Sequence, residues 1–130
     1  MRPFRYSLFW FLLGWVGVGL VVYLSLTSTP IRTTLVYGDK LGHLVAYALL
    51  MAWFVQLYQR RGWLLAHALF LVLMGVLIEF LQELNGRYFE YADMAANGIG
   101  VLLGALTVLT PWRDSLLRLE HYGITNSSPQ

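Results

Sequence analysis

The chain has 130 residues, 58% of them hydrophobic and 12% charged, with a formal net charge of +2 and no cysteine. Nine Lys and Arg and seven Asp and Glu side chains are too few to cover the surface of a soluble protein of this size. The composition therefore indicates a membrane protein, excludes disulfides and thiolate metal sites, and offers no basic, aromatic-rich run for a nucleic-acid partner.

Four apolar segments are long enough to cross a bilayer, which takes about 20 helical residues. In chain order, the predicted membrane-spanning helices cover residues 7–26, 41–58, 62–84 and 93–110. The first segment follows two arginines but is longer than the apolar part of a cleaved signal peptide, so we interpret it as a retained helix. The last ends before Pro111, which a helix does not readily continue through. The predicted fold is an all-α membrane protein: one domain over 1–130, with four transmembrane helices packed as a small bundle and a tail over 111–130.

The Lys and Arg residues are unequally divided between the two ends of this predicted bundle. The end that holds both termini would carry Arg2, Arg5, Arg60, Arg61, Arg113 and Arg118. The opposite end would carry Arg32, Lys40 and Arg87. Because cytoplasmic segments are enriched in Lys and Arg, we predict that both termini and the tail are cytoplasmic.

Polar residues occur at the predicted outer ends of the last three spans, where charged groups are costly unless they have a partner or a function. Helical spacing places several of them on common faces, such as Lys40, His43 and Tyr47 in the second span. The faces of three helices should therefore meet in one outward-facing polar site. The predicted site residues are Lys40, His43, Tyr47, Glu79, Gln82, Arg87, Asp93 and Asn97.

A purely structural interpretation of the same groups stays open. Lys40 and Arg87 could neutralise Glu79 and Asp93, forming an ion-pair network that holds the helices in register. Asp39 could act only as a cap at the start of the second span. On this interpretation the residues stabilise the fold without binding a ligand.

Three glycines and one histidine have predicted structural roles. Gly86, after Asn85, is expected to end the third helix in the left-handed conformation. Gly100 and Gly104 should let a neighbouring helix approach closely within the bundle. His67 lacks a motif partner, so we expect a buried, hydrogen-bonded or interfacial histidine there.

The polar motifs, in this order, resemble the VanZ-like family. They are Asp39-Lys40-x-x-His43 with Tyr47, Glu79-x-x-Gln82, Arg87, Asp93-x-x-x-Asn97 and Gly100-x-x-x-Gly104, and they extend over about half of the chain. The resemblance implies a multi-pass protein of the bacterial cytoplasmic membrane. It also implies an association with resistance to teicoplanin-type glycopeptides.

Three functions are compatible with the outward-facing site. The favoured one is a module that binds an envelope lipid, a lipid-linked cell-wall precursor or a lipophilic glycopeptide, with Lys40 and Arg87 facing anionic groups. The second is a membrane-embedded enzyme that acts on such a lipid, with His43, Glu79 and Asp93 as catalytic candidates. The third is a small oligomeric transporter with Glu79 as the proton-coupled carboxylate. Against it, Glu79 follows about seventeen apolar residues and so should lie at the rim, not at the midplane.

A metal site is a further alternative. His43, Glu79 and Asp93 could supply one nitrogen and two carboxylate ligands for Zn or Mn. The paired-histidine spacing of dedicated zinc motifs is missing, and Lys40 and Arg87 are available to the carboxylates. We therefore predict no metal and no cofactor.

Overall fold

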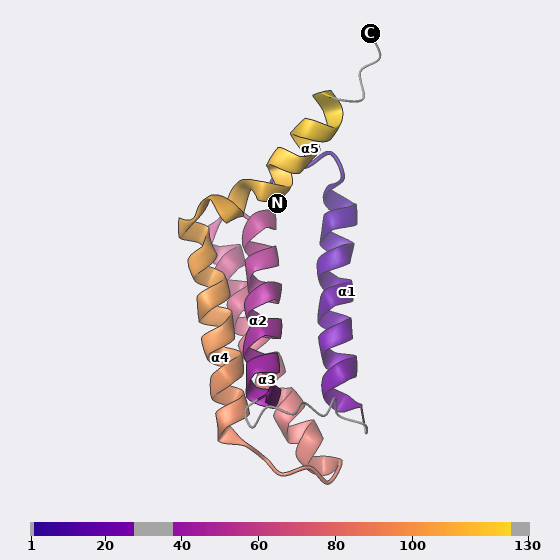
Figure 1. Cartoon of the computed structure of the whole chain (residues 1–130), viewed down its shortest axis with the longest axis vertical. Helices are drawn as coiled ribbons and strands as arrows, with labels where there is room; N and C mark the ends of the chain where they lie inside the picture. Colours follow the sequence, from indigo (N-terminus) through magenta and orange to yellow (C-terminus); the bar gives the residue numbers. More distant parts are fainter. Residues whose placement is uncertain (1, 28–37, 126–130) are drawn as a thin grey trace.

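The computed structural model describes residues 2–27 and 38–125, with side chains as far as residue 122. All regular structure within these ranges is helical (Figure 1), which confirms the predicted all-α class. The elements are α1 (Ser7–Leu26), α2 (Gly38–Leu57), α3 (Arg61–Leu84), α4 (Tyr91–Leu106), η1 (Thr107–Leu109), η2 (Pro111–Asp114) and α5 (Ser115–Thr125).

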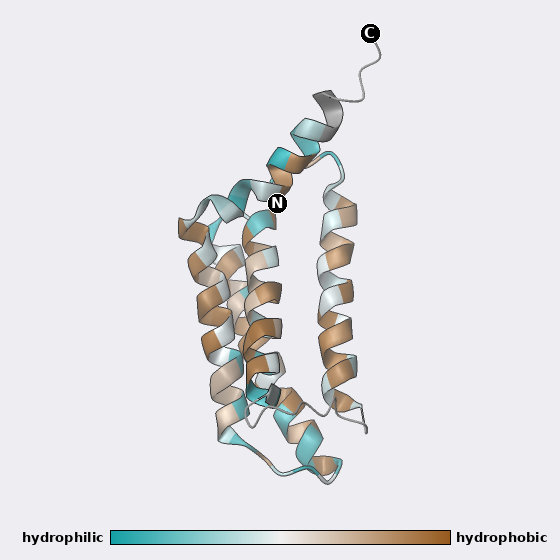
Figure 2. Cartoon of the chain, viewed as in Figure 1, coloured by the Kyte–Doolittle hydropathy of each residue, from teal (hydrophilic) through white to brown (hydrophobic). Residues whose placement is uncertain are grey.

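Four of these helices are long and apolar enough to cross a membrane, as predicted. They cover Ser7–Leu26, Gly38–Leu57, Arg61–Leu84 and Tyr91–Leu109. Figure 2 shows hydrophobic residues along the middle of each long helix and hydrophilic residues at the two ends of the bundle. The second helix begins at Gly38, three residues earlier than predicted, and Asp39 in its first turn interacts favourably with the helix dipole.

Helix α2 is the centre of the bundle and packs most closely against α4. Half of the residues in its 18-residue apolar stretch are buried, against 11% of those in the corresponding stretch of α1. A Cβ atom on Gly100 would collide with the Leu44 carbonyl oxygen, and one on Gly104 with the Ala48 carbonyl oxygen. Both glycines therefore let α4 contact the backbone of α2, which confirms the predicted packing face.

Helix α1 lies at the side of the other three (Figure 1). Gly14 and Val18 are its buried residues in the described part of the chain. The indole nitrogen of Trp53 donates a hydrogen bond of 3.2 Å to the Trp10 carbonyl oxygen and ties α1 to α2. Because the other residues of α1 are less buried by the rest of the chain, this helix is packed less tightly than α2, α3 or α4.

The N-terminal segment and α5 lie at the same end of the bundle (Figure 1). Arg2 is buried, and its Nη1 atom lies 2.5 Å from Asp114 Oδ1. Glu120 accepts hydrogen bonds from the backbone of the N-terminal segment and, at 2.6 Å, from the Trp10 indole. Residues 111–125 of the predicted tail thus form η2 and α5 and pack against the N-terminal segment, and residues 126–130 lie outside the described residues.

Candidate functional site

Charged side chains from α2, α4 and the connection before α4 meet at the end of the bundle opposite the chain termini. Lys40 Nζ lies 2.5 Å from Glu90 Oε2 and 3.3 Å from Asp93 Oδ1. The Nε2 atom of His43 lies 3.8 Å from Asp39 Oδ1 and 4.0 Å from Asp93 Oδ2. A continuous series of charged contacts therefore joins Glu90 to Asp39, with His43 between two carboxylates.

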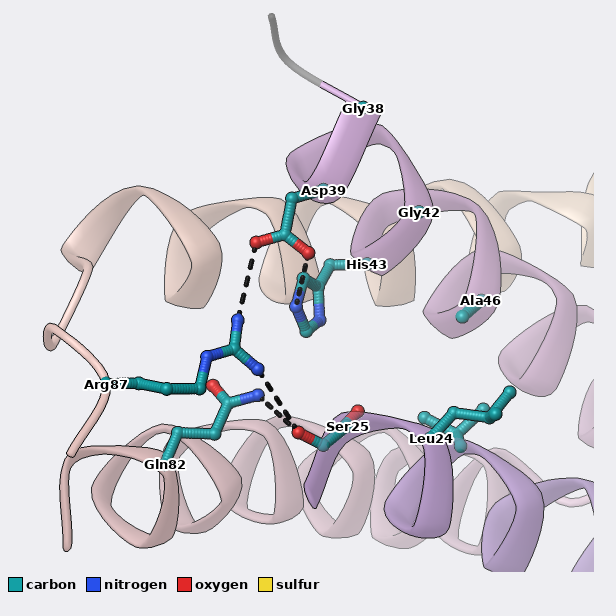
Figure 3. A pocket seen from close by; sticks show the side chains of 10 residues that line it. Leu24, Ser25, Gly38, Asp39, Gly42, His43, Ala46, Gln82 and Arg87 are labelled. Atoms are coloured by element: carbon teal, nitrogen blue, oxygen red, sulfur yellow. Dashed lines mark hydrogen bonds and ion pairs between the residues drawn. The ribbon is translucent and has the colours of Figure 1, made fainter. Parts of the chain in front are cut away.

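Arg87 and Gln82 extend this series from α3 to α1 (Figure 3). Arg87 Nη2 lies 3.6 Å from Asp39 Oδ2, and its Nη1 donates to the Ser25 carbonyl oxygen at 3.4 Å. The amide nitrogen of Gln82 donates to the same carbonyl oxygen at 2.8 Å. The last turn of α1 is thus tied to the site through its backbone.

The turn that ends α3 directs Arg87 toward Asp39. Gly86 has a φ of +80°, and its amide donates to the Glu83 carbonyl oxygen at 3.0 Å. The Arg87 amide donates to the Gln82 carbonyl oxygen at 3.1 Å. These two bonds and the left-handed glycine form a Schellman motif, which confirms the predicted turn.

The predicted cationic partner of Asp93 is present, but that of Glu79 is not. Asp93 contacts Lys40, whereas no described cation lies within ion-pair distance of Glu79. Glu79 instead accepts a hydrogen bond of 2.7 Å from the Glu90 amide. The expectation was wrong because Lys40 is drawn to Glu90 and Asp93, while Arg87 contacts Asp39. Glu79 therefore anchors the connection between α3 and α4.

Two predicted site residues lie deeper between the helices. Tyr47 is fully buried and Asn97 is 2% exposed. Within the described part of the chain, neither the Tyr47 hydroxyl nor either polar atom of the Asn97 amide has a hydrogen-bond partner. A Cβ on Gly75 would lie 3.0 Å from Asn97 Nδ2, so the amide fills the space that this glycine leaves. The polar region thus continues inward, below the charged contacts.

A pocket of about 250 Å³ opens beside the charged contacts (Figure 3). Its polar wall is formed by Asp39, His43, Gln82 and Arg87. Its apolar wall is formed by Val21, Leu24 and Ala46, with Ser25, Gly38 and Gly42 completing the lining. Three of the eight predicted site residues, His43, Gln82 and Arg87, therefore line it directly.

The site includes residues that the sequence interpretation left out of it. Asp39 was predicted as a helix cap, and it also contacts His43 and Arg87. Glu90 was not among the predicted residues, although its carboxylate contacts Lys40. The spacing of Asp39 and His43, one helical turn apart, was a signal available in the sequence. Nothing comparable marked Glu90, which lies outside the regular helices.

Possible metal ligands are grouped differently from the predicted set. Ligand atoms of Asp39, His43 and Asp93 all lie within 4.8 Å of one another. Glu79 belonged to the alternative ligand set considered from the sequence, but its carboxylate is turned toward the Glu90 amide. The three grouped residues provide one imidazole nitrogen and two carboxylates.

The opposite end of the bundle holds a second, aromatic pocket of about 370 Å³. His67 lies in its wall, is buried and has Nδ1 2.8 Å from the Trp63 carbonyl oxygen. A carbonyl only accepts, so this nitrogen carries the proton. The predicted buried and hydrogen-bonded role of His67 is confirmed.

Comparisons with protein-family models, with curated proteins and with solved structures each found no match. A functional assignment therefore depends on the geometry of the site. That geometry combines a polar wall able to donate and accept hydrogen bonds with an apolar wall. It also places an imidazole nitrogen between two carboxylates, an arrangement suited to proton transfer or to cation binding.

Proposed function

We propose that this chain is a VanZ-like integral membrane protein of the bacterial cytoplasmic membrane whose pocket binds the headgroup of an envelope amphiphile. Four apolar helices support the membrane assignment. The arginines beside the chain termini support a cytoplasmic location of that end, with the pocket facing outward. Of the residues used for this orientation, Arg32 lies outside the described residues.

The division of the pocket into a polar and an apolar wall is the observation that carries this proposal. Arg87, His43 and Gln82 can hydrogen-bond the phosphate, hydroxyl or amide groups of a headgroup. Val21 and Leu24 of α1 lie opposite and can contact the first carbons of an apolar chain. The looser packing of α1 supports entry from the lipid between this helix and the rest of the bundle.

The size of the pocket favours a lipid headgroup among the candidate ligands. Pockets for drug-sized molecules usually have about 300–1,000 Å³. At about 250 Å³ this pocket suits a headgroup better than a whole glycopeptide. An envelope lipid or a lipid-linked cell-wall precursor is thus preferred over the lipophilic glycopeptide, and resistance to teicoplanin-type compounds would follow indirectly.

A membrane-embedded enzyme is the second candidate, and the position of His43 favours it. Its Nε2 atom lies beside Asp39 and Asp93, so a proton taken from a substrate could be stabilised on the ring. The small transporter is less well supported. Its proton-coupling residue would be Glu79. This carboxylate accepts a hydrogen bond from the Glu90 amide, in the connection between α3 and α4 at the end of the bundle, whereas coupling sites usually lie near the midplane.

Lipid mass spectrometry on purified protein tests the binding proposal. The wild-type protein should co-purify with one lipid class enriched over the bulk membrane. Arg87→Ala removes the pocket's cationic donor, and one charge-assisted bond of about 1.5–3 kcal/mol corresponds to roughly a tenfold or greater loss of enrichment. Arg61→Ala, at the opposite end of the bundle, is the matched control and should keep the wild-type profile. Equal profiles for both variants would contradict the proposal.

His43→Gln separates binding from catalysis. Glutamine retains hydrogen bonding but cannot exchange a proton near neutral pH. A binding module should lose about 1 kcal/mol, or about fivefold in affinity for the co-purified lipid. An enzyme should lose about a hundredfold or more in the rate at which that lipid is converted.

A further inference from the structure

Among the described residues at the outer end of the bundle, carboxylates outnumber cations. Three described carboxylates there, those of Asp39, Glu90 and Asp93, contact Lys40 or Arg87. A fourth, that of Glu79, accepts a hydrogen bond from the backbone amide of Glu90. With all four carboxylates ionised and His43 neutral, these residues would carry a formal charge of −2. A bound cation is one way to compensate such charge next to a low-dielectric interior.

Three of its side chains surround a common point at metal-ligand spacing. His43 Nε2 lies 3.8 Å and 4.0 Å from the nearest oxygen atoms of Asp39 and Asp93, beyond hydrogen-bond distance. Nitrogen and oxygen ligands about 2.0–2.2 Å from a tetrahedral ion lie about 3.4 Å apart. The observed separations are too long for direct hydrogen bonds, and a small inward movement of the side chains would let them hold one ion.

Asp93 has few partners for its two carboxylate oxygens among the described residues. This residue is 2% exposed, and Lys40 is its described cationic partner. Its Oδ2 atom lies 4.0 Å from His43 Nε2, too far for a hydrogen bond with the ring. A buried carboxylate normally accepts several hydrogen bonds or coordinates a metal. Lys40, at 3.3 Å, contacts Oδ1 alone.

We propose that Asp39, His43 and Asp93 bind one divalent transition-metal ion of the Zn²⁺ or Mn²⁺ type. The imidazole nitrogen favours a transition metal over Mg²⁺ and Ca²⁺, which prefer oxygen ligands alone. The two positive charges of the ion would neutralise the cluster. This site differs from the set considered from sequence because Asp39 takes the place of Glu79. It stands whether or not the pocket binds a lipid.

Metal binding to the purified protein tests this site directly. The protein is isolated in detergent with an affinity tag that contains no histidine, treated with EDTA and dialysed against micromolar Zn²⁺. Elemental analysis should find about one Zn²⁺ per chain, and His43→Gln and Asp93→Asn should each weaken binding at least tenfold. His67→Gln replaces a buried histidine at the opposite end and should retain wild-type binding. A folded wild-type protein that binds no Zn²⁺, or unchanged binding by folded His43→Gln, would overturn the proposal.

X-ray absorption at the zinc edge keeps the proposal testable if the variants do not fold. The wild-type spectrum should show nitrogen and oxygen ligands at about 2.0–2.2 Å with the contribution of a single imidazole. A first shell with two or more imidazoles, or with water alone, would assign the zinc to another place and refute this site.

Discussion

Replacement of Gly100 by alanine should separate α4 from α2. The added methyl group would meet the Leu44 carbonyl oxygen, the Tyr47 Cβ atom at 3.1 Å and the Ala48 amide nitrogen at 3.2 Å. Two of these three are backbone atoms of a buried helix and cannot rotate away. Overpacking of this kind usually costs about 1–3 kcal/mol.

Gly98→Ala is the matched control on the same helix. No described atom lies within 4 Å of the position that its Cβ would take. Both substitutions gain the same helix propensity, about 1 kcal/mol for alanine over glycine, so this gain cancels when they are compared. Gly100→Ala should therefore be less stable than Gly98→Ala by about 1–3 kcal/mol.

Reversible unfolding of the two variants in mixed detergent micelles, followed by circular dichroism, measures this difference. Asp93 lies seven residues before Gly100, about two turns along the same helix. The shift of α4 should therefore also move Asp93 away from Lys40 and weaken the lipid co-purification of Gly100→Ala. Equal unfolding free energies for the two variants would show that α2 and α4 do not approach as closely as the structure indicates.

Three further predictions concern the two ends of the bundle. Burial alone would raise the pKa of Glu120, but hydrogen bonds from Trp10 and the N-terminal backbone outweigh it and hold that pKa below the ordinary 4.5. The contact between α5 and the N-terminal segment is therefore stabilised above about pH 4.5, and it is weakened as the pH falls through the lowered pKa of Glu120. Hydrogen exchange in α5, corrected for intrinsic rates, should accelerate on acidification. The α5 amides of Glu120→Gln should exchange rapidly already at neutral pH. Exchange in the wild type that does not depend on pH would contradict this prediction. Gly86→Ala places a side chain in the left-handed backbone region, so it should lower the unfolding free energy by about 1 kcal/mol. It should also reduce lipid enrichment, because Arg87 is displaced. A wild-type unfolding free energy together with wild-type lipid enrichment would contradict the role of the turn. An impermeant thiol reagent applied to intact cells should label Tyr88→Cys and not Arg61→Cys, and the reverse pattern would invert the proposed orientation. Arg32→Cys should be labelled and Ser127→Cys should not, and both of these positions lie outside the described residues.

Several features of this protein were predictable because they depend on short stretches of chain. A run of about 20 apolar residues has few alternatives to a membrane-spanning helix, since its backbone must bond within itself. Gly86 was recognisable because the left-handed turn that ends a helix favours glycine. The close approach at Gly100 and Gly104 followed from their spacing on one helical face.

The tail and α1 show where local patterns lose their information. Residues 115–125 are too few and too polar to span a membrane, so the sequence indicated only a tail. Their helix packs against Trp10 through Glu120, a residue 110 positions away in the chain. The loose packing of α1 was equally unpredictable, because its composition resembles that of the better buried spans.

The pairing of charges was decided by tertiary structure alone. Helical spacing shows which residues share a face, and it correctly grouped Lys40 with His43. It does not show how far one helix is shifted along another, and each residue of shift moves a side chain by about 1.5 Å. That offset, together with the turn after α3, gives Asp39 and not Glu79 to Arg87, and turns Glu79 toward the Glu90 amide. The sequence by itself determined the four long apolar helices and the polar end of the bundle, and the packing of the helices decided which atoms face one another there.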